Sequence, residues 1–135
     1  MTDFEWKDAF DTGHGKIDEQ HRRMFMLAVA VVESRFANAS NMIGVGLEPL
    51  NALIEFTKEH FAFEEALMQS TGYPGIVWHA KFHASLLTEL RTFSRKVQQG
   101  GIPDADALIK FFRIWVHEHI DTADRELVDW LGKLI

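Results

Sequence analysis

The chain has 135 residues, a length typical of one domain with its own hydrophobic core. It carries 14 basic and 20 acidic residues, and the resulting net charge of −6 disfavours binding to nucleic acid or to an anionic membrane surface. It has no cysteine, which excludes disulfides, zinc–thiolate sites, iron–sulfur clusters and a thiol nucleophile. We therefore expect a single domain over residues 1–135.

The N-terminal segment is polar and mixed in charge, so it has none of the features of a signal peptide. No run of about 18 apolar residues occurs, which leaves no candidate for a membrane-spanning helix. We expect a cytoplasmic protein with no membrane partner. The seven histidines are a high number for this length, and they are the feature of the composition that most needs an explanation.

An N-terminal arm, from residue 1 to about residue 16, precedes the first predicted helix. The arm carries three aromatic side chains that we expect to pack on the outside of the fold: Phe4, Trp6 and Phe10. Asp18 is the predicted N-cap of this helix, because a short carboxylate accepts hydrogen bonds from the first free N–H groups. The predicted inward face recurs at helical spacing and holds His21, Met24, Phe25, Ala28, Val31, Val32 and Phe36.

A loop rich in Asn, Ser and Gly over residues 38–46 leads to a second helix, which we expect to begin near Leu47. Its predicted inward face holds Leu50, Leu53, Thr57, His60, Phe61, Glu64 and Met68. The turn Gly72-Tyr73-Pro74-Gly75 ends it. The third helix is predicted to turn inward His79, Phe82, His83, Leu86, Leu90, Phe93 and Val97.

Gly100, Gly101 and Pro103 form the next predicted turn. The inward residues of the fourth helix are Leu108, Phe112, Trp115, Val116 and His119, followed by Asp121 and Asp124. A last short helix between Arg125 and Leu134 is expected to pack Leu127 and Trp130. Four helices with short connections predict an all-α fold: an up-down-up-down antiparallel four-helix bundle with an N-terminal arm and a short C-terminal helix.

Two pairs of metal-binding side chains are spaced by four residues: His60 with Glu64, and His79 with His83. Residues four apart stand on the same face of an α-helix, so each pair aims two ligands at one point. Both pairs are in register with apolar residues and therefore point into the core. Buried imidazoles and carboxylates need partners there, and a metal ion is a partner that they can share.

Seven groups of this kind lie on the predicted inward faces: His21, His60, Glu64, His79, His83, His119 and Asp124. One ion rarely takes seven such ligands, whereas two ions bridged by two carboxylates do. Asp124 lies about 140° from His119 on a straight helix, so both reach one site only if the helix is broken between them. Asp121 and Thr122 favour such a break. Nitrogen and carboxylate donors without sulfur suit iron or manganese as well as zinc.

A series of short motifs runs along nearly the whole chain, from about Trp6 to Trp130. The motifs are Ile17-Asp18-Glu19-Gln20-His21 with Met24-Phe25, His60-Phe61 with Glu64-Glu65 and Met68, Gly72-Tyr73-Pro74, His79-x-x-x-His83, and Trp115-x-x-x-His119-Ile120 with Asp124. In this order and with these intervals the chain resembles the hemerythrin family, in particular its single-domain bacterial members. The Glu-x-x-His signature of ferritin-like carboxylate proteins is absent.

The resemblance implies a pair of non-heme iron ions (Fe2+/Fe3+) joined by a bridging oxo or hydroxo group. The ligands that it implies are His79, His83 and His119 for one iron, His21 and His60 for the other, and Glu64 and Asp124 as bridges. The second iron then keeps one open position, at which dioxygen binds.

The expected wall around that position is apolar and is formed by Met24, Phe61, Trp115, Val116 and Ile120. A dry wall without an acid or base admits dioxygen and discourages further chemistry. We therefore expect reversible dioxygen binding, for storage, delivery or sensing, and no enzymatic activity. The alternatives are a di-iron peroxidase, a nitric-oxide-handling enzyme, a sensor module acting with a partner protein, and a structural zinc bundle. The chain runs to Ile135 without a signalling output domain, so we do not expect a sensor that acts alone.

Three further polar residues are expected to lie outside the site. Glu65 is predicted to be a solvated neighbour of Glu64. His117 lies about 200° from His119 on a helix and is expected at the surface. His14 is expected to be a partly exposed residue of the arm.

Overall fold

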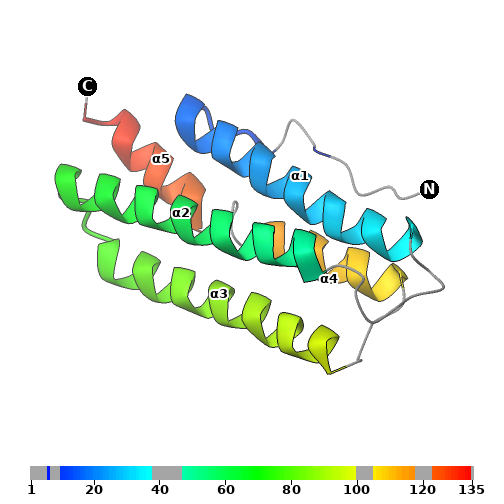
Figure 1. Ribbon diagram of the computed structural model, residues 1–135. Coiled ribbons are helices and arrows are strands. Elements are labelled where there is room, and N and C mark those ends of the chain that lie inside the picture. Colours follow the sequence, from blue (N-terminus) through cyan, green and yellow to red (C-terminus); the bar gives the residue numbers. More distant parts are fainter. Residues whose placement is uncertain (1–5, 7–9, 38–46, 100–104, 118–122, 135) are drawn as a thin grey trace.

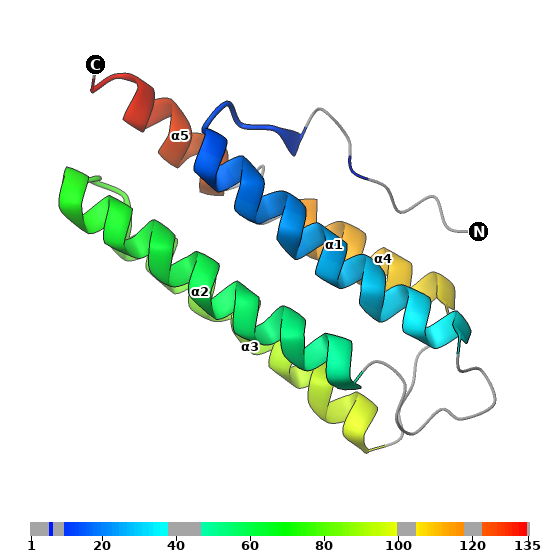
Figure 2. The ribbon, with the colours of Figure 1, turned by 45° about the horizontal axis from the view of Figure 1, so that its top comes forward.

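The computed structural model describes residues 6, 10–37, 47–99, 105–117 and 123–134. Within this part the helices are α1 (Gly15–Ala37), α2 (Leu47–Thr71), α3 (Ile76–Gln98), α4 (Ala105–His117) and α5 (Arg125–Gly132), and no described residue lies in a strand. Helices α1 to α4 alternate in direction (Figure 1). Helix α1 lies beside α2 and α4, and α2 lies beside α3 (Figure 2). The predicted all-α bundle with a short C-terminal helix is confirmed. None of the described helices is both long and apolar enough to cross a membrane.

The first helix begins at Gly15, so the prediction that Asp18 is its N-cap is wrong. Asp18 lies in the first helical turn, where its carboxylate points back to the arm. It accepts hydrogen bonds from the N–H and hydroxyl of Thr12, at 2.8 and 2.7 Å, and from the N–H of Gly13 at 3.0 Å. Burial acts to raise the pKa of Asp18, but these hydrogen bonds outweigh it and lower that pKa. The charged side chain therefore joins the arm to the positive end of the helix.

His14 supplies the cap that the sequence assigned to Asp18. Its Nδ1 accepts a hydrogen bond from the N–H of Ile17 at 3.2 Å, which satisfies one of the free donors at the start of α1. The side chain is half-buried, in agreement with the expected partial exposure. His14 thus has a structural role at the helix end.

The described aromatic residues of the arm pack against α1. The ring of Trp6 meets those of Phe10 and Phe25 edge-on, with centroid distances of 5.3 and 5.7 Å. The prediction that Trp6 and Phe10 cover the outside of the bundle is confirmed, while Phe4 lies outside the described residues.

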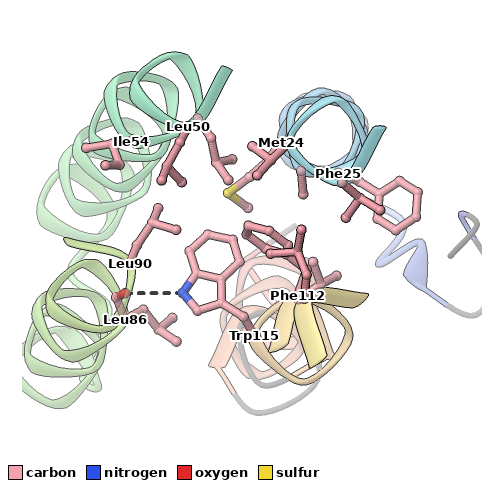
Figure 3. Packing of buried hydrophobic residues seen from close by; sticks show 14 of the residues in the cluster. Met24, Phe25, Leu50, Ile54, Leu86, Leu90, Phe112 and Trp115 are labelled. Carbon is pink, nitrogen blue, oxygen red and sulfur yellow. Dashed lines mark hydrogen bonds between the residues drawn. The ribbon is translucent and has the colours of Figure 1, made fainter. Parts of the chain in front are cut away.

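The apolar faces of the helices meet in one long core, seen in cross-section in Figure 3. Its buried residues include most of the predicted inward apolar positions: Met24, Phe25, Ala28, Val31, Val32, Leu50, Leu53, Phe61, Leu86, Leu90, Val97, Leu108, Phe112, Trp115 and Val116. Phe82 and Phe93 are half-buried at its edge, and the side chain of Phe36 lies outside the described residues. The helical spacing in the sequence therefore identified the core correctly.

A second, smaller apolar cluster occupies the end of the bundle where α1 begins, α2 ends and α5 lies (Figure 1). Its fully buried or nearly buried members are Ile17, Met68, Tyr73 and Leu127. On α1, His21 lies between Ile17 of this cluster and Met24 of the long core. The predicted ligands thus form a polar layer between two apolar ones, which shields them from water.

Candidate metal centre

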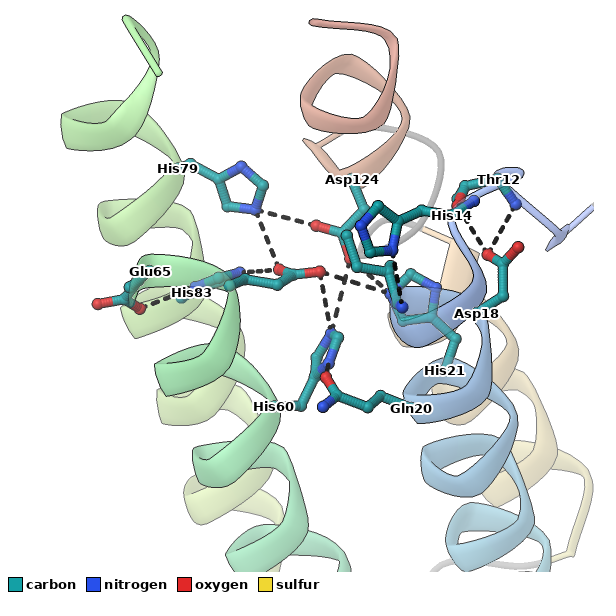
Figure 4. Close-up of polar contacts among 12 residues, drawn as sticks. Thr12, His14, Asp18, Gln20, His21, His60, Glu65, His79, His83 and Asp124 are labelled. Atoms are coloured by element: carbon teal, nitrogen blue, oxygen red, sulfur yellow. Dashed lines mark hydrogen bonds and ion pairs between the residues drawn. The ribbon is translucent and has the colours of Figure 1, made fainter. Parts of the chain in front are cut away.

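Six of the seven predicted ligands lie in the described part of the chain, and all six are buried. Their exposed fractions are 1% for His21, 0% for His60, Glu64, His79 and Asp124, and 2% for His83. They come from four different helical segments and lie close together, and Figure 4 shows five of them, His21, His60, His79, His83 and Asp124, converging on one small region. The seventh ligand, His119, lies outside the described residues, as does Ile120.

Helix α2 contributes His60 and Glu64, and α3 contributes His79 and His83, each pair one turn apart. Helix α1 contributes His21 near its start. Asp124 lies in a wider, π-helical turn directly before α5. The predicted break between His119 and Asp124 lies outside the described residues, as do Asp121 and Thr122, so it stays a prediction.

The two carboxylates divide their oxygens between two pairs of histidines. Oδ2 of Asp124 lies 2.6 Å from Nε2 of His21 and 3.7 Å from Nε2 of His60. Oε2 of Glu64 faces the same two nitrogens, at 3.8 and 3.2 Å.

The other oxygen of each carboxylate faces α3. Oδ1 of Asp124 lies 2.9 Å from Nε2 of His79. Oε1 of Glu64 lies 3.4 Å from the same atom and 2.9 Å from Nε2 of His83. Each carboxylate therefore spans two adjacent positions.

The ligand atoms form two groups of four in which all atoms lie within 4.8 Å of one another. We call them the α1/α2 half, which holds His21, His60, Glu64 and Asp124, and the α2/α3 half, which holds Glu64, His79, His83 and Asp124. Each half offers two imidazole nitrogens and two carboxylate oxygens. A pair of bridged metal ions is the arrangement that uses every one of these donors.

The electrostatics of the site also fit cations. Burial acts to lower the pKa of His60 and His79, but Glu64 and Asp124 outweigh it and raise each pKa to about 9. Burial and the charge of Asp124 act to raise the pKa of Glu64, but His60 and His79 hold it far below its usual range. Buried anions thus require positive charge beside them, which protons or metal ions supply.

One carboxylate oxygen has an ion-pair contact but no hydrogen bond of good geometry among the described residues. Oε2 of Glu64 is buried and accepts no hydrogen bond from the described residues, although Nε2 of His60 is only 3.2 Å away. A buried lone pair without a donor costs free energy unless a cation takes it. The donor set therefore fits iron, and equally a soft-to-borderline divalent ion such as zinc.

Two outer residues that the sequence analysis did not assign hold the histidine rings from behind. Oε1 of Gln20 accepts a hydrogen bond from Nδ1 of His60 at 2.7 Å. Oε2 of Glu65 accepts one from Nδ1 of His83 at 2.8 Å. Glu65 is partly exposed beside Glu64, as expected, and its hydrogen bond to His83 is a contact that the sequence did not predict. Both contacts cross from one helix to the next, so spacing along one helix gave no signal for them.

The described residues of the predicted apolar wall lie on the side of the long core. Met24, Phe61, Trp115 and Val116 are 1 to 4% exposed. The ring of Phe61 stacks on that of His83, with centroids 3.9 Å apart and planes 6° apart. The indole N–H of Trp115 donates to the carbonyl of Leu86 at 3.1 Å (Figure 3). This contact fixes the indole over the interior of the bundle.

His117 is exposed, as expected.

Comparisons with known proteins agree with this geometry. The sequence profile of the family described as "Hemerythrin HHE cation binding domain" matches residues 12–131. A bacteriohemerythrin of Clostridium acetobutylicum is 28% identical over 131 residues, which cover 93% of this chain and 99% of that protein. A hemerythrin of Sipunculus nudus is 33% identical over 90% of this chain and 87% of its own length.

A third relative, the myohemerythrin of Riftia pachyptila, is 26% identical over 90% of this chain and 88% of its own length. No solved structure matches the chain significantly.

Proposed function

Because the chain belongs to the hemerythrin family, we propose that it binds dioxygen reversibly at a pair of non-heme iron ions. Proteins of this family bind oxygen and are not enzymes, in agreement with the expectation from the sequence. The role beyond binding is proposed to be storage, delivery or sensing of dioxygen.

The two halves of the centre would each hold one iron. His21 and His60 would bind the iron of the α1/α2 half, and His79, His83 and His119 that of the α2/α3 half. Glu64 and Asp124 would bridge the two ions together with an oxo or hydroxo group. The iron pair, when bound, supplies an open coordination position in the α1/α2 half and the electrons for reversible binding. The single observation that carries this assignment is the division of the oxygens of Glu64 and Asp124 between two histidine pairs.

The residues of the chain exclude water and protons from the open position. The long core covers the site from one side, and the cluster around Ile17 and Leu127 covers it from the other. The described side chains of the wall, Met24, Phe61, Trp115 and Val116, have no group that exchanges protons near neutral pH. Without a proton donor, bound dioxygen is more readily released unchanged than reduced further.

The test is to load the metal-free chain with ferrous iron under anaerobic conditions and then to admit air. We expect two irons per chain, and a visible charge-transfer band that appears with oxygen and disappears when oxygen is removed. Rapid turnover of added peroxide, or consumption of nitric oxide, would favour an enzyme instead. A single zinc ion per chain, with no spectral response to air, would contradict the proposal.

A further inference from the structure

The two halves of the metal centre differ in what stands behind their histidines. In the α1/α2 half, Nδ1 of His60 donates to the neutral side-chain amide of Gln20 at 2.7 Å. In the α2/α3 half, Nδ1 of His83 donates to the carboxylate of Glu65 at 2.8 Å. The inner ligand sets of described residues are matched, two imidazoles and the same two carboxylates on each side. The outer partners are therefore a clear asymmetry between the halves.

Each outer partner adjoins a ligand in sequence and reaches a ligand on the next helix. Gln20 precedes His21 on α1 and contacts His60 on α2, while Glu65 follows Glu64 on α2 and contacts His83 on α3. The backbone of each therefore lies beside a ligand of one helix, while its side chain contacts a ligand of the next helix (Figure 4). Both are thus placed to act on a particular imidazole ring.

Glu65 reaches solvent, whereas the ring that it contacts does not. Its side chain is 41% exposed, whereas that of His83 is 2% exposed. It lines a surface cavity of about 300 Å³ between α2 and α3, together with Lys58, Phe61 and His83. Solvent screens part of this charge, but the carboxylate oxygen lies 2.8 Å from Nδ1 of the buried His83 ring. In the same half, Nδ1 of the buried His79 has no hydrogen-bond partner among the described residues.

A carboxylate and an amide act differently on an imidazole that binds metal through Nε2. The acceptor holds the proton on Nδ1, and an anionic acceptor draws that proton further from the ring than a neutral one does. The ring of His83, whose Nδ1 faces the carboxylate, therefore donates more electron density through Nε2. A stronger donor stabilises a ferric ion more than a ferrous one, since the ferric ion carries the higher charge.

We propose that Glu65 and Gln20 are positioning residues that add to the difference between the two halves already made by His119 and the open position, and that they favour first oxidation of the α2/α3 half. This inference rests on the proposed function, because it concerns the iron pair. In a one-electron titration, ferricyanide takes the electron and one Fe2+ becomes Fe3+. The anion behind His83 directs that first loss to the α2/α3 half, and the amide behind His60 keeps the α1/α2 half ferrous for dioxygen.

The test compares the iron-loaded full chain with three variants, Glu65→Gln, Gln20→Glu and the double exchange, in a spectroelectrochemical titration. Glu65→Gln keeps the hydrogen bond and removes the charge. We expect it to make the first oxidation about tenfold less favourable, a rise of about 59 mV in that one-electron potential. Gln20→Glu should instead make oxidation of the α1/α2 half easier and narrow the gap between the two potentials. The double exchange should narrow the gap by about the sum of the two single changes, because His119 and the open position still distinguish the halves.

Glu59→Gln is the matched control, since Glu59 is an exposed residue on the same helix and its loss changes the net charge equally. Its potentials should equal those of the unchanged chain. If Glu65→Gln holds two irons and shifts the first potential no more than Glu59→Gln does, the inference is overturned while the proposed function stands.

A second readout needs neither iron nor oxygen. In the zinc-loaded chain, which is diamagnetic, the Nδ1 proton of His83 should resonate further downfield in the NMR spectrum than that of His60, and Glu65→Gln should remove this difference. Equal proton shifts in the unchanged chain would overturn the inference. An unchanged chain that takes up no iron pair would overturn the proposed function and the inference together.

Discussion

Glu64 and Asp124 lie side by side in the interior, and each turns one oxygen to each half of the metal centre. Two buried carboxylates whose oxygens lie within 4.8 Å of one another repel each other. For this reason Asp124 acts to raise the pKa of Glu64. The histidines outweigh the repulsion in the metal-free chain. Because both halves depend on the same two carboxylates, the halves should be occupied or lost together.

Replacing Asp124 with Asn should therefore remove both ions. The amide keeps the size of the side chain but loses the charge that both halves share, and an uncharged amide is a poor bridge between cations. We expect the iron content to fall from two per chain towards none, measured by metal analysis after anaerobic loading. Asp129→Asn, at an exposed position on α5, is the control and should keep both ions. A stable Asp124→Asn chain with a single firmly held iron would show that the halves bind independently.

The raised pKa of about 9 of His60 and His79 predicts that metal uptake releases protons. At pH 7 both rings are protonated in the metal-free chain, and each must lose a proton before its nitrogen can bind a metal. Adding zinc in weak buffer at pH 7 should release about two protons per chain from these rings, and the number should fall towards zero above pH 9. A release that is independent of pH over this range would contradict the raised values.

The same groups set the pH dependence of folding of the metal-free chain. The raised pKa of His60 stabilises the fold fully below its ordinary value of 6.5, and this contribution disappears as the pH rises through about 9. The contribution of His60 to the free energy of unfolding is on the order of 3 kcal/mol. The lowered pKa of Glu64 acts in the opposite sense, stabilising fully above its ordinary value of 4.5. The free energy of unfolding in urea should therefore be greatest between these two values and should decline towards pH 9.5. Bound metal should remove most of the decline at high pH, since it replaces the protons.

The inward positions could be predicted from the sequence because burial follows the helical period. His21, His60 and Glu64 occur in register with residues such as Met24 and Phe61, so a polar layer within the core was expected before the fold was known. The same period predicted the partners of this layer on α3. What spacing specifies is which face of a helix each residue occupies.

Contacts between helices could not be predicted in this way. Gln20 and Glu65 reach across to rings on neighbouring helices, which depends on how closely and at what angle the helices pack. The cap of α1 was misplaced for a related reason. Asp is a common N-cap, but the arm folds back so that Asp18 binds Thr12 while His14 meets the free N–H group. Local preference was overridden by the path of the arm.

Thr57 is a buried hydroxyl next to the site, and replacing it with Val should stabilise the chain. Its side chain is fully buried on α2, about one turn before His60, and its Oγ1 has no hydrogen-bond partner among the described residues. Val has nearly the same shape and no polar atom, so it should raise the free energy of unfolding by about 1 kcal/mol. Urea denaturation of the metal-free chain measures this change.

Thr88→Val is the matched control for Thr57, because Thr88 is exposed on α3. It should change the free energy of unfolding by less than about 0.5 kcal/mol. If Thr57→Val is instead destabilising, the hydroxyl has a partner such as an ordered water. In that case the apolar side of the metal centre is less dry than the proposed function requires.

The indole of Trp115 should protect the oxygenated form, and two substitutions separate its bulk from its hydrogen bond. Trp115→Leu replaces a large side chain of the pocket wall with a smaller one, so water and protons should reach the site. The oxygenated form should then decay several times faster. Trp115→Phe keeps an aromatic ring there but loses the bond to the carbonyl of Leu86, at a cost of about 1 kcal/mol in the free energy of unfolding. The decay of the visible band in air measures the first effect, and urea denaturation measures the second. If Phe and Leu shorten the lifetime equally, the N–H bond that fixes the ring matters more than its bulk. If neither changes the lifetime, Trp115 is a core residue with no part in guarding bound oxygen.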